Sequence, residues 1–245
     1  MIRLILGLAL LPTAALTVFA AAQMLGSLTM HASSARPFLA GALVAVGLWL
    51  LGWAAERRGR DLPARALRAL RWVYVFGHEL THVLAAWSVG AQVHDMQVSS
   101  DGGHVDLSRS GAFISLAPYC IPIYTVFVVL GYRILGGHGP GRPGLGLFLA
   151  LMGLTLAGHL LMTGECVWQR RQPDLIAAGG LVFSLVVIAL CNGLAVMVLT
   201  KALFPRAVVL AGSLRRVATL SAGFWGWNYR FFKGCLGPLM VGHTV

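Results

Sequence analysis

The sequence predicts an all-α polytopic membrane protein with about six transmembrane helices and one small β-hairpin. Of its 245 residues, 58% are hydrophobic and only 11% are charged, whereas soluble domains carry about a quarter charged residues. The charges cluster between long apolar runs, each close to the ~20 residues that a helix needs to cross a bilayer. We expect spans at residues 4–22, 38–55, 70–89, 112–132, 144–163 and 177–203.

The first apolar run has some features of a signal peptide. Arg3 precedes it, and Ala20-Ala21-Ala22 resembles a cleavage site. Its apolar core is longer than the ~7–15 residues of a signal peptide, and five more apolar runs follow. We therefore expect this run to be retained as the first span.

Basic residues outnumber acidic ones, giving a formal net charge of +11. If six spans alternate, 15 of the 19 Lys and Arg residues fall on the side of the N-terminus: Arg3, the six between 57 and 71, Arg133, Arg142 and the six between 201 and 233. The positive-inside rule then places both termini in the cytoplasm. The charge pattern thus indicates orientation and attraction to anionic lipid, and no nucleic-acid motif accompanies it.

The residues with the clearest chemistry are His78-Glu79-Leu80-Thr81-His82, inside the third apolar run. Residues four apart share one face of a helix, so His78 and His82 can hold one Zn²⁺. Glu79 is then placed to take a proton from water at the metal. Ionisable residues within a span are costly and indicate function.

A catalytic zinc site usually needs a third protein ligand. Asp174 follows Pro173 at the entry to the sixth run, on the side of the membrane where the third run ends. An acid after a proline is also ordinary chemistry for a helix start, so both interpretations of Asp174 remain open. The other polar candidates are His94, Asp95, Asp101, His104, Asp106, His159 and Glu165.

His159 lies well inside the fifth apolar run. There it can stabilise the oxyanion of a tetrahedral intermediate. It can equally be an interhelical hydrogen-bonding histidine. The sequence does not choose between these two roles.

The polar segment 90–110 predicts a β-hairpin, because residues 93–98 and 104–107 partly alternate around Asp101-Gly102-Gly103. Such a hairpin can offer an edge strand to an unfolded substrate, or it can simply join two spans. Pro118 and Pro122 then predict a kinked or broken helix in the next run.

Two regions follow from this pattern. We expect residues 1–204 to form the transmembrane part. Its core, at about 70–204, contains the His78–His82 motif. Residues 205–245 form a tail in which Arg215-Arg216 precedes interleaved aromatic and basic residues at 224–233. That composition is typical of a segment at the membrane interface.

The ordered motifs together resemble bacterial M50-like membrane metallopeptidases, relatives of the site-2 proteases. The resemblance covers about residues 70–200 and rests on five features: Phe76 to His82, the turn at Gly90, the Ser-Ser-Asp-Gly-Gly-His hairpin at 99–104, Leu116-Ala117-Pro118-Tyr119 with Pro122-Ile123-Tyr124, and Gln172-Pro173-Asp174-Leu175.

This resemblance implies a multi-pass zinc endopeptidase of the bacterial inner membrane that acts on membrane-associated polypeptides. His78, His82 and Asp174 would hold the zinc, with Glu79 as the general base. Site-2 proteases typically carry Leu-Asp-Gly around the aspartate, whereas this chain has Pro173-Asp174-Leu175. Many of them also work near the cytoplasmic face, while the charge count puts Asp174 outside. Either the orientation differs, or the count of spans is off by one.

Two other classes of function are compatible with the sequence. One is a membrane scaffold or assembly factor that keeps the fold without hydrolysing peptides. The other is a metal-handling or transport protein. The intact His78, Glu79 and His82 disfavour a scaffold, which needs no base. The lack of an inverted repeat in the sequence disfavours a transporter.

Overall fold

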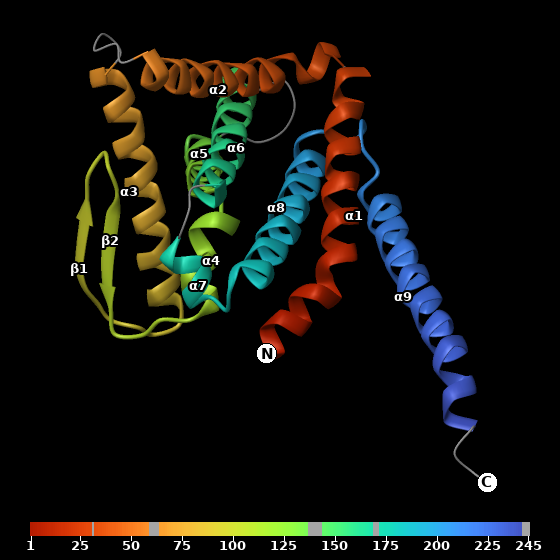
Figure 1. Ribbon diagram of the computed structural model, residues 1–245. Helices are drawn as coiled ribbons and strands as arrows, with labels where there is room; N and C mark the ends of the chain where they lie inside the picture. Colours follow the sequence, from red (N-terminus) through yellow and green to blue (C-terminus); the bar gives the residue numbers. More distant parts are fainter. Residues whose placement is uncertain (31, 59–63, 137–143, 169–171, 242–245) are drawn as a thin grey trace.

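The computed structural model describes residues 1–30, 32–58, 64–136, 144–168 and 172–241. It is mostly helical with one small antiparallel sheet, as the sequence predicts (Figure 1). The helices are α1 (Ile2–Met30), α2 (Ala32–Arg58), α3 (Ala64–Ser88), α4 (Ala112–Cys120), α5 (Ile123–Ile134), α6 (Leu145–Trp168), α7 (Pro173–Ala177), α8 (Leu181–Leu203) and α9 (Leu210–Val241); the strands are β1 (Val93–Val98) and β2 (Gly103–Leu107).

Four helices in the described part of the chain are long and apolar enough to cross a membrane: α1, α2, α6 and α8. The pair α4 and α5 adds a fifth span if it is counted as one broken helix. The predicted six spans are not confirmed. The difference lies in α3, which is not among the candidate spans of the described residues.

Helices α1 and α8 run side by side in the same direction. The backbone of Phe183 lies against Gly7 near the start of both helices, and Thr17 lies against Gly193 farther along. Moving ten residues toward the C-terminus of α1, from Gly7 to Thr17, therefore matches moving ten residues toward the C-terminus of α8, from Phe183 to Gly193. If six spans alternated, the first and the last would run in opposite directions.

Helices α2 and α6 are also parallel. Gly41 lies against the backbone of Ala150, and the indole Nε1 of Trp49 donates to Glu165 Oε2 at 2.9 Å farther along both helices. The two helices can approach so closely because Gly41 has no Cβ; a Cβ there would lie 1.9 Å from the carbonyl oxygen of Ala150. Small residues at such crossings are typical of membrane helices.

Both parallel pairs contradict six alternating spans, and both agree with five spans in which α3 does not cross. A direct contact at one end of the fold agrees with the same arrangement. Arg3 Nη1 donates to the carbonyl oxygen of Ala178, at the end of α7, at 3.0 Å. The start of α1 and Asp174 thus lie at the same end, and the prediction that separated Arg3 from Asp174 is wrong.

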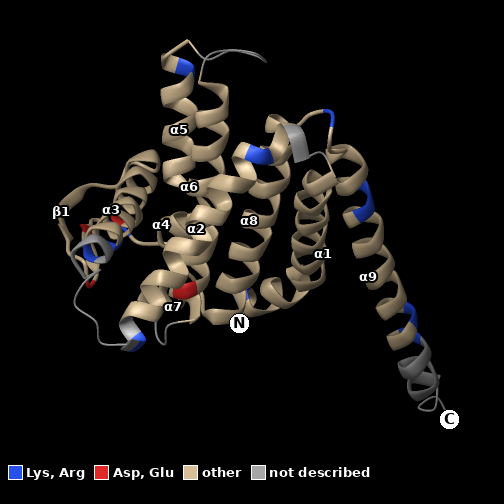
Figure 2. Ribbon diagram, turned by 90° about the horizontal axis from the view of Figure 1, so that it is seen from above, with Lys and Arg blue, Asp and Glu red and all other residues tan. Residues whose placement is uncertain are grey.

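The broken helix and the hairpin are confirmed. Helices α4 and α5 are bent by 66° at the break, with Pro122 at the N-cap of α5. Strands β1 and β2 pair antiparallel, and the amide of Ser99 donates to Gly102 across the turn at 3.0 Å. The hairpin lies beside α3 at one edge of the molecule, while α9 lies at the opposite edge beyond α1 (Figures 1 and 2).

Most of the predicted tail at 205–245 forms one helix, α9, and residues 242–245 lie outside the described part of the chain. It runs antiparallel to α1, where the hydroxyls of Thr13 and Ser221 form a hydrogen bond. Figure 2 shows basic but no acidic residues on α9, in agreement with its sequence. Its place at the membrane interface stays a prediction.

Candidate metal centre

Helix α3 presents His78 and His82 on one face, one turn apart. Their ring centroids are 5.1 Å apart. Both side chains are largely buried, with about a tenth of their surface exposed. The i, i+4 spacing therefore produces the paired imidazoles that the sequence predicts.

Asp174 approaches both histidines from α7. Its Oδ2 lies 3.7 Å from His78 Nε2 and 3.5 Å from His82 Nε2. One ligand atom from each residue lies within 4.8 Å of the other two. Two imidazoles and a carboxylate are ligands that zinc accepts in catalytic sites, so these residues fit the metal that the resemblance implies.

Both interpretations of Asp174 describe part of its surroundings. Pro173 and Asp174 do begin helix α7, as ordinary helix-start chemistry requires. No side chain caps that helix end, however, and the carboxylate is directed at the two histidines. Burial raises the pKa of Asp174, but the interactions of its carboxylate with His78 and His82 outweigh burial and lower that pKa below its ordinary value.

The ring of His82 is fixed by the backbone of α4. Its Nδ1 lies 2.9 Å from the carbonyl oxygen of Ile114. A carbonyl only accepts, so Nδ1 carries the proton and donates it. The other ring nitrogen, Nε2, then faces Asp174. Histidines that bind metals usually donate their other ring N–H in this way.

Glu79 is buried next to the two histidines, with 6% of its surface exposed. Strand β2 covers it: a Cβ on Gly103 would lie 2.6 Å from Glu79 Oε1. Only a glycine lets the hairpin approach this carboxylate so closely. The hairpin is therefore part of the site as well as a connection between helices.

The site opens onto a cleft of about 730 Å³. Its walls come from α3, the hairpin turn with β2, α4, α6 and α7, and His78, Glu79, His82 and Asp174 all line it. Residues of β2 line the cleft, whereas none of β1 do. The outer edge of β2 thus faces the space beside the site.

His159 is not one of the described residues that line this cleft. Its Nε2 lies 3.1 Å from Asn192 Oδ1, and it borders a smaller cavity of about 160 Å³ on the other side of His78. This geometry is that of an interhelical hydrogen-bonding histidine. The oxyanion role of His159 stays a prediction.

The other polar candidates divide into two groups. Asp101, His104, Asp106 and Glu165 line the cleft, but they do not join the group of possible metal ligands. His94 and Asp95 lie exposed on β1, where Asp95 bonds locally to Met96 and Gln97.

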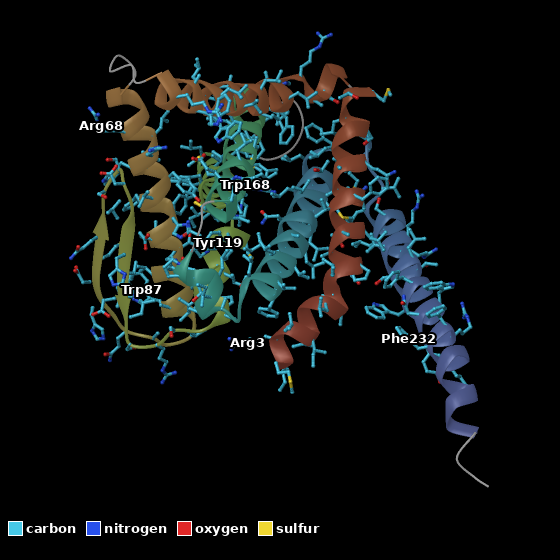
Figure 3. The ribbon with its side chains drawn as sticks, viewed as in Figure 1. Arg3, Arg68, Trp87, Tyr119, Trp168 and Phe232 are labelled. Carbon is cyan, nitrogen blue, oxygen red and sulfur yellow. The ribbon has the colours of Figure 1, made fainter. Side chains whose placement is uncertain are left out.

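Three residues of the site were given no role there from the sequence: Gly103, Tyr119 and Asn192. The hydroxyl of Tyr119 donates to Asp174 Oδ2 at 3.1 Å, and the ring of Tyr119 meets that of His78 edge to face at 5.0 Å. Figure 3 shows Tyr119 in the interior of the molecule, on α4. Two signals in the sequence point to it: its place between Pro118 and Pro122, and its position in the Leu116–Tyr119 segment of the resemblance.

Comparisons of the chain with protein-family models, with curated proteins and with solved structures find no match. The functional argument therefore depends on the geometry of the site. Two histidines and an aspartate from two separate helices converge beside a buried glutamate. This set can hold a divalent metal and can move a proton next to it.

Proposed function

We propose that this protein is a zinc-dependent endopeptidase, of the site-2 protease type, that hydrolyses peptide bonds of membrane-associated polypeptides. The observation that carries the proposal is the convergence of His78, His82 and Asp174 within 4.8 Å. Glu79 lies beside them on the same cleft. A scaffold would have no use for a buried carboxylate at this position, because burying it is costly.

His78, His82 and Asp174 would hold the metal. When bound, zinc supplies a Lewis acid that polarises the peptide carbonyl and makes water a better nucleophile at neutral pH. Two imidazoles and one carboxylate leave room for water and substrate in such sites. The hydrogen bond from His82 to Ile114 keeps this imidazole in the ligand tautomer.

Glu79 acts as the general base. It takes a proton from the attacking water and passes it to the amine that leaves when the peptide bond breaks. The side chain has the position for this role, since it lines the cleft beside both histidines. Gly103 restricts the carboxylate from the hairpin side, which reduces the number of orientations that it can adopt.

The edge of β2 would receive the substrate. A polypeptide that leaves a membrane helix must become extended before a protease can attack it, and an exposed strand edge binds extended chains through backbone hydrogen bonds. The part of β2 from Gly103 to Leu107 lines the cleft. Candidate spans α6 and α8 flank α7, which favours substrates that are themselves in or at the membrane.

We further propose that the site faces the cytoplasm, in the inner membrane of a bacterium. Arg3 contacts the end of α7, and Arg71 lines the cleft. Arg57 lies at the end of α2, which runs parallel to α6 toward Asp174. A concentration of Arg at one end of the spans is typical of the cytoplasmic side. With five spans, the N-terminus lies on this side too.

Metal analysis of the purified protein tests the first part of the proposal. The wild type and Glu79→Gln should each contain about one zinc per chain, because Glu79 is not a ligand. His78→Ala should lose it. Wild-type protein without stoichiometric zinc after purification and zinc addition would rule out the enzyme.

A further inference from the structure

Tyr119 is a fully buried tyrosine, with 0% of its surface exposed, whose hydroxyl points at the candidate metal centre. Its hydroxyl donates to Asp174 Oδ2 at 3.1 Å and lies 3.5 Å from Gln172 Oε1. Oδ2 is the same carboxylate oxygen that faces His78 and His82. The hydroxyl of Tyr119 thus restrains the carboxylate oxygen of Asp174 that faces both candidate histidine ligands.

The backbone of Tyr119 is itself held by a buried amide. Tyr119 is next to last in α4, where the helix breaks, so its carbonyl loses the partner that a continuous helix would supply. Asn192 Nδ2 of α8 donates to this carbonyl at 2.8 Å, and to Ile188 in its own helix at 2.9 Å.

His159 completes this network. Both amide contacts of Asn192 Nδ2 are donations, which leaves Oδ1 as the acceptor. His159 Nε2 lies 3.1 Å from Oδ1 and must therefore donate to it. Helices α6 and α8 thus fix α4 at its broken end, and α4 fixes Asp174 through Tyr119.

We propose that Tyr119 is a positioning residue for the third metal ligand. This inference depends on the proposed function, since it presumes that Asp174 binds zinc. Helix α7 has only five residues, too few to hold the aspartate by itself. The hydroxyl of Tyr119 sets the orientation of the carboxylate before the metal arrives. Outer partners of metal ligands typically contribute about 10- to 100-fold to metal affinity.

Tyr119→Phe tests the role of the hydroxyl, because it keeps the ring and its edge-to-face contact with His78. We expect its dissociation constant for zinc, measured by competition with a chelator on the full-length purified protein, to rise about 10- to 100-fold. Tyr132→Phe is the matched control. The Tyr132 hydroxyl is buried without a hydrogen-bond partner in the described part of the chain, so its removal should leave zinc affinity unchanged.

The coordination spectrum separates positioning from a general loss of stability. With Co²⁺ in place of zinc, the visible absorption reports the ligand set and its geometry. Tyr119→Phe should alter this spectrum, while Tyr132→Phe should give that of the wild type. A zinc affinity of Tyr119→Phe within about threefold of that of Tyr132→Phe, with an unchanged cobalt spectrum, would overturn the positioning role of Tyr119. The proposed enzyme would still be supported in that case if the wild type binds zinc. Wild-type protein that binds no zinc would overturn both.

Discussion

Gly103 of the hairpin lies directly against the side chain of Glu79 in α3. A Cβ at Gly103 would lie 2.5 Å from Glu79 Cγ and 2.6 Å from its Oε1. Real Cβ atoms do not approach other atoms so closely. The hairpin therefore covers the proposed base, and its strand β2 has its place at the cleft because residue 103 has no side chain.

Gly103→Ala should therefore reduce proteolysis without removing the metal. The added methyl group must displace either Glu79 or strand β2, and a displacement of about 1 Å at a catalytic group can cost about 100-fold in rate. The measurement is the yield of Glu79-dependent fragments from membrane proteins in cells, with zinc content determined in parallel.

Gly111→Ala is the control for that substitution. Gly111 has an extended φ of 175°, and a Cβ there meets nothing within 4 Å. It should keep wild-type activity. If Gly103→Ala cleaved as well as Gly111→Ala, the position of Glu79 under the hairpin would have no importance for the reaction.

Asp174→Ala should weaken zinc binding by more than about 100-fold, since a direct ligand should contribute more than an outer partner. Asp101→Ala removes another carboxylate from the same cleft, at the exposed turn of the hairpin, and should leave zinc affinity unchanged. Competition with a chelator measures both. Equal zinc affinities for Asp174→Ala and Asp101→Ala would reduce Asp174 to the ordinary start of α7.

The N-terminus and the hairpin turn should lie on the same side of the membrane. One epitope tag is placed before Met1 and, in a second variant, one is inserted after Asp101. Antibody access is compared in intact spheroplasts and in inverted vesicles, using fully permeabilised membranes as the control. Both tags should be reached only in inverted vesicles. Access to the two tags from opposite sides would restore six spans and contradict the contact of Arg3 with Ala178.

Local patterns in the sequence predicted much of this fold and of the site. The apolar runs became helices, the alternation around Asp101 became a hairpin, and the prolines at 118 and 122 mark the broken helix. The four-residue spacing of His78 and His82 directly gave their shared face. These features depend on neighbours in the sequence, where helix and strand periods are visible.

The direction of the helices could not be obtained in the same way. Hydropathy identifies an apolar run without saying whether it crosses the membrane, so the sequence predicts the apolar half of α3 as the third of six spans. The parallel packing of α1 on α8 corrects this error. Tyr119 and Asn192 were missed for a related reason: their hydrogen bonds join residues far apart in the chain, and no local pattern indicates such partners.

Comparison of the wild type with Glu79→Gln tests the proposed peptidase most directly. New N-termini in the membrane fraction are quantified in cells that produce equal amounts of either protein, after zinc analysis shows that both are loaded. Fragments made by the wild type should fall by about 100-fold or more with Glu79→Gln, as expected for loss of a general base. Identical fragments in both, with equal zinc, would contradict peptide hydrolysis at this site.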